Sequence, residues 1–164
     1  MRPMLASVSA YTISIWIHVS AAVAGFGATF AGAVAFPLAL RQPRHLPFVH
    51  HLSLAINRRL ATPALVVVLI TGFYQVGKGD WSVGSFWISA TLAIVIVLGG
   101  LVGAYFVPTD RRLAEMAERE LAAAGDGPFT PSPEYQRLAQ REGGIGALAG
   151  LLIVAAVFLM VTKP

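Results

Sequence analysis

The chain contains no cysteine, which excludes disulfide bonds, thiolate metal sites and cysteine nucleophiles. Charged residues are also scarce. They make up 12% of the sequence, whereas a soluble domain has roughly 25%. No phosphate-binding glycine loop, Ser-His-Asp set or zinc-ligand helix motif is present, and the Gly-Gly-Ile-Gly run at 143–146 follows no strand. These absences argue against a soluble domain and leave no complete catalytic set.

Apolar length is what the chain has instead: 56% of its 164 residues are hydrophobic, and the mean hydropathy is +0.70. Four apolar stretches are long enough to cross a bilayer as helices, which takes about 20 residues, and none alternates as a barrel strand does. They cover residues 11–40, 60–76, 83–107 and 143–161. The first is longer than the apolar core of a signal peptide, so it is expected to be a permanent span. We therefore predict an all-α fold, an integral membrane four-helix bundle that forms a single domain over residues 1–164.

The basic residues lie mainly in the first and third connections between these stretches. These two connections hold nine of the twelve, namely Arg41, Arg44, Arg58, Arg59, Arg111, Arg112, Arg119, Arg137 and Arg141. Cytoplasmic loops are enriched in Lys and Arg, so we predict an inner-membrane protein with both termini outside. The arginines would then contact anionic lipid headgroups. This distribution accounts for the pI of about 10.0 without a nucleic-acid partner. Basic and aromatic residues are not interleaved as they are on a nucleic-acid-binding surface.

The third connection is predicted to be a cytoplasmic helical extension between spans three and four. Thr109 or Asp110 is a candidate N-cap for its first helix, and the Gly-Asp-Gly-Pro run at 125–128 is expected to end that helix. Ser132 and Pro133 suit the start of the helix that leads into span four. We expect a solvated hairpin that fixes the geometry of spans three and four, with a docking surface for a partner as the alternative.

Small residues predict which helix faces pack closely, because lipid tails are as apolar as leucine. The first span carries a stripe of alanines and glycines, and spans three and four each carry a Gly-x-x-x-Gly spacing. The glycines are Gly25, Gly32, Gly99, Gly103, Gly146 and Gly150. They could pack within one monomer or between subunits of a homo-oligomer or membrane complex. The second span has fewer small residues and is expected to lie more peripherally.

His18 is the one histidine inside an apolar stretch, on the same helix face as Ser14 and Gly25. A polar residue at this depth usually faces the bundle interior, so we expect a hydrogen-bond partner such as Ser89 or Thr91 of span three. A structural hydrogen bond, a haem or metal ligand and a proton relay all remain open for His18.

No carboxylate pair is expected within the spans, because none of the eight acidic residues falls inside one. Three more histidines, His45, His50 and His51, lie in the first connection. Adjacent residues on a helix point about 100° apart, which is a poor chelating geometry. We therefore expect headgroup or loop contacts for these histidines, with a cytoplasmic metal site as the alternative.

Three short segments carry a family resemblance: IHVSAAV at 17–23, RRLATPAL at 58–65 and ITGFY at 70–74. They resemble a bacterial family of predicted four-helix integral membrane proteins of unknown function. That family is similar in turn to the membrane domain of copper-resistance protein D and to small haem-binding membrane protoporphyrinogen oxidases. The resemblance implies a four-span fold and makes His18 the candidate haem ligand. Gly25 stands where a tryptophan commonly follows that histidine, and no span contains the lysine of the oxidases.

Three functions remain open from the sequence. The absent catalytic set and the small-residue faces favour a non-enzymatic four-helix protein that acts as a subunit or small oligomer. The alternatives are a haem- or copper-handling redox protein that uses His18, and a small transporter. Pro63, Thr71 and Gln75 are the features of span two that would suit a transporter.

Overall fold

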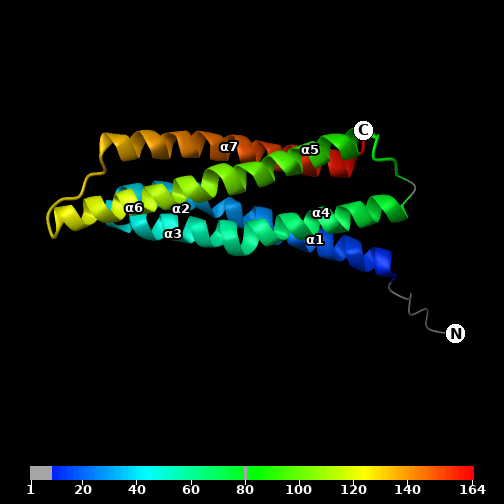
Figure 1. Cartoon of the computed structure of the whole chain (residues 1–164), viewed down its shortest axis with the longest axis horizontal. Helices are drawn as coiled ribbons and strands as arrows, with labels where there is room; N and C mark the ends of the chain where they lie inside the picture. Colours follow the sequence, from blue (N-terminus) through cyan, green and yellow to red (C-terminus); the bar gives the residue numbers. More distant parts are fainter. Residues whose placement is uncertain (1–8, 80) are drawn as a thin grey trace.

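The computed structural model describes residues 9–79 and 81–164, and every regular element within them is helical (Figure 1). Consecutive elements join into four long helical rods, each long and apolar enough to cross a membrane. The elements are α1 (Ala10–Thr29), α2 (Ala31–Arg41), α3 (Leu46–Ile56), α4 (Thr62–Lys78), α5 (Phe86–Leu101), α6 (Val107–Ala124) and α7 (Pro133–Thr162). The prediction of an all-α protein with four membrane-crossing helices is confirmed.

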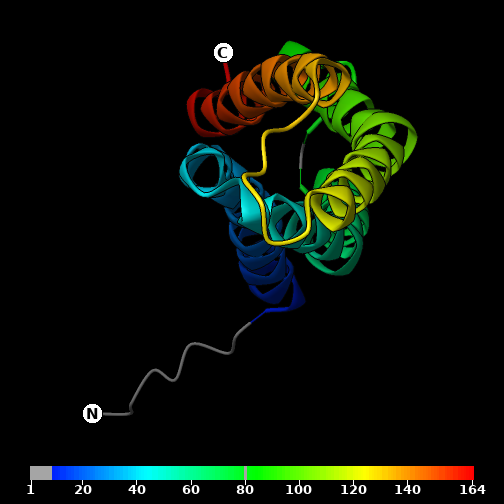
Figure 2. The same ribbon diagram turned by 90° about the vertical axis from the view of Figure 1, so that its left-hand side faces the viewer.

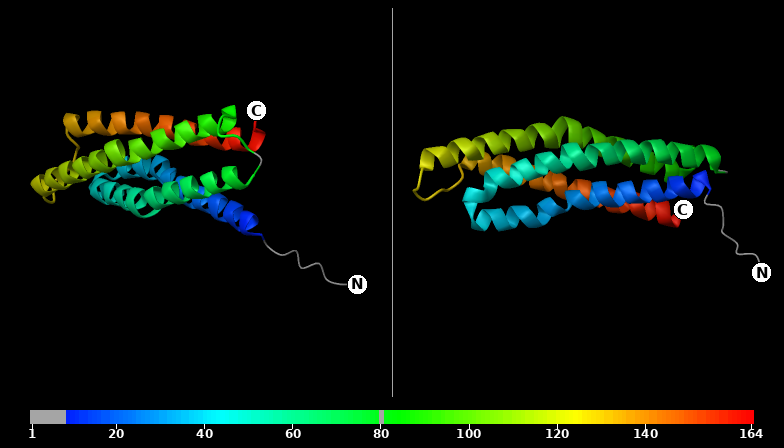
Figure 3. Two further views of the ribbon diagram at one scale, coloured as in Figure 1. Left: turned by 45° about the vertical axis from the view of Figure 1, so that its right-hand side comes forward. Right: turned by 90° about the horizontal axis from the view of Figure 1, so that it is seen from below.

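The four rods alternate in direction (Figures 1 and 3). The start of α1, the α4–α5 turn and the end of α7 lie at one end of the bundle, and the α2–α3 and α6–α7 connections lie at the other. We call this second end, formed by residues 39–59 and 107–142, the arginine-rich end. Arg44 joins its two connections, because its Nη2 donates to the carbonyl oxygens of Gly125 and Gly127 at 2.9 and 2.7 Å. Gly125 follows α6 with φ 54°, a left-handed conformation that favours glycine.

Two of the rods contain a wider, π-helical turn shortly before a proline. These turns are Asn57–Ala61, ahead of Pro63, and Val102–Phe106, ahead of Pro108. Proline has no N–H to donate to the carbonyl one turn earlier, and a wider turn accommodates that missing bond. A helix irregularity thus precedes Pro63, and a second one lies beside it in the neighbouring rod.

The helix continues through Pro108, so the predicted N-cap at Thr109 or Asp110 is wrong. The helix is already formed by α5 and the π turn, and no new N-terminus needs a cap. The predicted start of α7 is confirmed: Ser132 is the N-cap, its Oγ accepts from Tyr135 N at 3.2 Å, and Pro133 is the first helical residue. No separate extension is seen in the described part of the chain, because α6 continues α5 and α7 is one 30-residue helix.

The rods pack mainly in pairs, α1 along α4, α3 along α6 and α5 along α7. At Gly25 the backbones of α1 and α4 come so close that an added Cβ would overlap the Cβ of Ala64. The expectation that span two lies peripherally is therefore wrong. One small residue on each helix is enough for a close crossing, and Ala64 supplies it on α4.

The bundle has two hydrophobic cores rather than one. The core within the apolar half contains Leu65, Val95, Leu98, Val102, Ala149 and Ile153. The core of the arginine-rich end contains Ala39, Leu46, Val49, Leu113, Met116, Ala117, Phe129 and Tyr135. The predicted solvated hairpin is therefore only half solvated, because the inner faces of α6 and the start of α7 pack against α2 and α3.

The four rods do not close completely around these cores. A largely apolar groove of about 840 Å³ lies between α7 on one side and α1, α2 and α3 on the other. Figure 2 looks along the bundle from the arginine-rich end and shows α7 facing α2 across the interior. Phe30 reaches from the junction of α1 and α2 toward α7, where a Cβ added at Gly150 would lie 3.3 Å from its ring.

Candidate functional site

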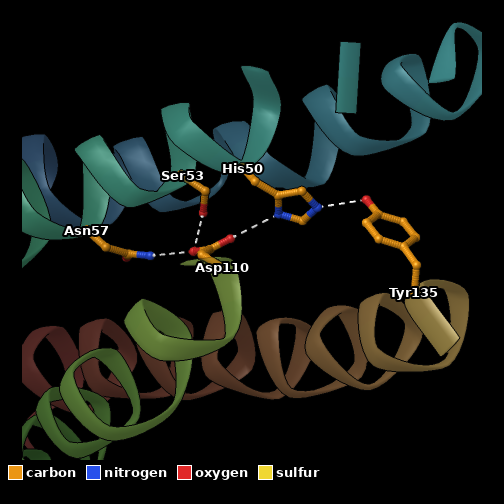
Figure 4. Close-up of polar contacts among 5 residues, drawn as sticks. All are labelled: His50, Ser53, Asn57, Asp110 and Tyr135. Atoms are coloured by element: carbon orange, nitrogen blue, oxygen red, sulfur yellow. Dashed lines mark hydrogen bonds and ion pairs between the residues drawn. The ribbon is translucent and has the colours of Figure 1, made fainter. Parts of the chain in front are cut away.

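The most completely buried polar group of the arginine-rich end is the imidazole of His50, which is 0% exposed. Its Nε2 lies 2.7 Å from the hydroxyl of Tyr135, and its Nδ1 lies 3.3 Å from Oδ1 of Asp110 (Figure 4). The expectation of headgroup or loop contacts is therefore wrong for His50. Helix α3 packs against α6, which turns this side of α3 toward the protein interior.

Asp110 is the centre of the hydrogen bonds in this cluster and is 1% exposed. Its Oδ2 accepts from Ser53 Oγ at 2.8 Å and from Asn57 Nδ2 at 3.2 Å (Figure 4). Its Oδ1 is left facing His50. Ser53 and Asn57 thus hold one carboxylate oxygen and direct the other toward the imidazole.

Glu142 of α7 completes the cluster and is 7% exposed. One ligand atom from each of His50, Asp110 and Glu142 lies within 4.8 Å of the other two. Among residues 9–79 and 81–164, no N–H or hydroxyl group donates to the Glu142 carboxyl group, whose polar neighbour is the carboxyl group of Asp110; Glu142 also lines the groove. The sequence argued only against a carboxylate pair within the apolar stretches, and α6 and α7 bring two carboxylates together just outside them.

Helix periodicity explains why these residues converge. His50, Ser53 and Asn57 follow one another at i, i+3 and i+7, so they share one face of α3 and its π turn. Tyr135 and Glu142 are also seven residues apart and share a face of α7. This polar spacing was the signal available in the sequence, but only the packing of α3, α6 and α7 reveals that the faces meet.

Chemically, two buried carboxyl groups and one imidazole are a donor set that can hold a cation. Burying a charge is costly unless it is paired. The three ion pairs of the described residues give neither carboxylate a Lys or Arg partner, although arginines are abundant at this end. The group can therefore balance its charge only through protons or a bound cation.

His18 has a simpler environment in the apolar half of the bundle. It is 7% exposed, and its Nδ1 lies 2.8 Å from Thr71 Oγ1. The Thr71 hydroxyl donates to the carbonyl of Val67 at 2.6 Å, so it accepts from His18, whose Nδ1 carries the hydrogen. His18 therefore points into the bundle as expected.

The predicted partners of His18 on span three are wrong, because α1 packs against α4 instead of α5. Gln75 of α4 adds a second polar tie to α1 by donating to the carbonyl of Ser14 at 3.2 Å. Thr91 is buried on α5, and its hydroxyl has no hydrogen-bond partner among the described residues. The structure brings no second histidine to His18, since His50 lies at the arginine-rich end and His45 and His51 are exposed there.

The glycines singled out in the sequence fall into two groups. Gly25 packs against Ala64, and Gly150 lies beside Phe30. A Cβ added at Gly99, Gly103 or Gly146 would meet nothing within 4 Å, and one added at Gly32 would meet only Phe36 of its own helix. Close packing inside the monomer therefore uses two of the six.

The fold and the four apolar rods define a multi-pass α-helical integral membrane protein. The chain belongs to the family described as predicted integral membrane protein (DUF2269), a family of unknown function whose model matches residues 12–164. No curated protein and no solved structure matches the chain. The resemblance to a family of predicted integral membrane proteins of unknown function is thus confirmed. The further similarity to copper-resistance and haem proteins stays a prediction.

Proposed function

We propose that the protein is a non-enzymatic membrane subunit that acts as a small homo-oligomer, in which a transmembrane helix of a second copy occupies the groove. The observation that carries the proposal is the open groove of about 840 Å³ beside α7. Small residues line both of its walls. They are Ala28, Gly32 and Ala35 on α1 and α2, and Gly143, Gly146 and Gly150 on α7. Such walls let another helix backbone approach closely, which is what drives helix association in lipid.

A second small-residue face supports pairing between copies. Gly99 and Gly103 lie on α5, and a Cβ at either position would meet nothing within the monomer. This face and the groove are both available on one chain, so two copies can bury both without a different partner. The lack of a complete catalytic set in the sequence agrees with a role in assembly.

The oligomeric state in a native-like membrane disc tests the proposal. Gly146→Leu and Gly103→Leu should each shift the protein from oligomer to monomer, because the leucine would fill the space for the second helix. Gly27→Leu is the matched control: Gly27 is an exposed glycine of α1 outside the groove, and its Cβ position is also open. A monomeric wild type with lipid in the groove would overturn the proposal.

We further propose that the arginine-rich end is cytoplasmic and that α6 and the start of α7 extend beyond the bilayer there. The α5–α6 rod has 39 residues, about 58 Å of helix at 1.5 Å per residue, whereas the apolar core of a bilayer is about 30 Å thick. Because the chain has no cysteine, Ser82→Cys and Asp126→Cys each give a single labelling site. We expect an impermeant thiol reagent to label Ser82→Cys from outside and Asp126→Cys only after the membrane is opened. The reverse labelling pattern would show that the arginine-rich end faces the outside.

A further inference from the structure

We propose that His50, Asp110 and Glu142 bind a first-row divalent metal ion, such as Zn²⁺, Mn²⁺ or Fe²⁺. The proposal does not depend on oligomerisation. The three residues come from α3, α6 and α7, and their nearest ligand atoms lie within 4.8 Å of one another. One imidazole nitrogen and two carboxylate oxygens form a donor set that suits these metals, whereas Ca²⁺ and Mg²⁺ prefer oxygen alone.

The distance between Nδ1 of His50 and Oδ1 of Asp110 supports a shared ion. It is 3.3 Å, longer than the roughly 2.7–2.9 Å of a hydrogen bond between charged groups. Two ligands at about 2.1 Å from a tetrahedral metal lie about 3.4 Å apart. The two side chains are therefore spaced as neighbours around a metal ion and need only small movements to bind one.

The side chains that contact the proposed ligands also orient them. The ring nitrogen of His50 that faces away from Asp110 lies 2.7 Å from the hydroxyl of Tyr135. A metal-bound histidine usually engages its other nitrogen in this way, which fixes the ring and the tautomer. Asp110 is held similarly, since Ser53 and Asn57 bind Oδ2 and leave Oδ1 for the ion.

The environment of Glu142 supports the proposed metal site independently of the distance between His50 and Asp110. Its side chain is more than nine-tenths buried, and within the described ranges its carboxyl group faces the carboxyl group of Asp110 instead of an N–H or hydroxyl donor. A divalent ion would neutralise the two carboxylates with a neutral imidazole as third ligand, which removes the cost of burying like charges together. The ion would take the place of a proton shared between the two carboxyl groups.

The site is reachable and incompletely enclosed. Glu142 lines the groove together with Ser53 and Asn57, so in a chain whose groove is not yet filled by a second copy the groove leads to the ligands. Three protein ligands leave at least one coordination position for water or a further ligand, as in zinc sites that are not purely structural. The geometry points to an exchangeable site.

Co²⁺ is a suitable probe, because it replaces Zn²⁺ and absorbs visible light when bound. The purified full-length protein, freed of metal with a chelator, should take up one Co²⁺ per chain with visible absorption bands and a raised melting temperature. Zn²⁺ should displace the Co²⁺ and abolish the bands. Acidification should release the metal, because the ligands bind it in their deprotonated forms.

Four variants separate a metal site from a structural cluster. Glu142→Gln keeps the shape of the side chain and should abolish Co²⁺ uptake while the protein stays folded, and His50→Gln should do the same if it folds. Tyr135→Phe should weaken binding by about 10- to 100-fold, because it frees the ring of His50. The control His51→Gln/Glu118→Gln removes an exposed His–Glu pair, 2.6 Å apart, and should bind normally.

Absence of Co²⁺ and Zn²⁺ binding to the wild type would overturn the proposal. Undiminished binding to folded Glu142→Gln, or loss of binding in the control variant, would also overturn it.

Discussion

His18 and His50 are both buried histidines of one bundle, but they are held in different ways. In the apolar half, one nitrogen of His18 bonds to Thr71, and the helices beside it meet through their backbones at Gly25 and Ala64. At the arginine-rich end, both nitrogens of His50 have polar neighbours, supplied by Asp110 and Tyr135. The comparison indicates that close backbone packing fixes the first region and that converging side chains fix the second.

Removing the central carboxylate should have the largest effect on this comparison. Asp110→Ala leaves Ser53, Asn57 and His50 without their shared acceptor in a buried site. We expect a loss of about 3–5 kcal/mol in the free energy of unfolding, because at least two donors of the cluster lose their acceptor at about 1–3 kcal/mol each. Reversible unfolding in mild detergent measures it.

Asp110→Asn is the matched variant, because its amide oxygen can still accept from Ser53 and Asn57. It should recover a clear part of the stability that alanine loses. If Asp110→Ala is as stable as the wild type, the cluster does not hold the arginine-rich end together. Glu115→Ala, at an exposed position of the same helix, should change little.

Close packing in the His18 region gives the next largest expected effect. Gly25→Leu cannot be accommodated without separating α1 from α4, because even a Cβ would overlap Ala64. We expect a loss of about 1–3 kcal/mol or failure to assemble, as is usual for overpacking. Gly27→Leu, two residues away with open space around it, should be nearly silent in the same thermal unfolding assay. Equal effects of the two substitutions would contradict the α1–α4 contact.

The same two regions show how much of the fold can be predicted from the sequence. Apolar length predicted the four rods, and the cap at Ser132 with Pro133 predicted the start of α7. The neighbours of each rod were not predicted, because several rods carry small residues and the sequence does not say which faces meet. For this reason His18 was assigned a partner on α5, whereas α4 supplies Thr71.

The polar cluster was missed because its residues lie in segments that look like cytoplasmic connections. His50 is one of two adjacent histidines, Asp110 lies two residues after a proline, and Glu142 precedes a glycine run. Each has an ordinary local interpretation as a loop, cap or surface residue. Their meeting depends on the helix passing unbroken through Pro108 and on α7 beginning early enough to bring in Glu142. The continuation through Pro108 cannot be predicted from local propensity, whereas the start of α7 follows from the cap at Ser132 and from Pro133.

The smallest expected effect is that of the single hydrogen bond in the apolar half. His18→Phe keeps the ring volume and removes the bond to Thr71, which in turn keeps its own bond to Val67. We expect a loss of about 0.5–1.5 kcal/mol, the usual net contribution of one hydrogen bond.

Thr71→Val provides the second arm of a double-mutant cycle, because it removes the same bond from α4. If the bond is the main role of His18, the double variant should be little less stable than either single one, and optical spectra of all four proteins should be alike. Strict additivity would show that the two side chains do not interact. Loss of a bound chromophore in His18→Phe alone would instead show that His18 is a haem ligand. His18 and His50 would then both be ligands, and the two regions would differ in what each histidine binds.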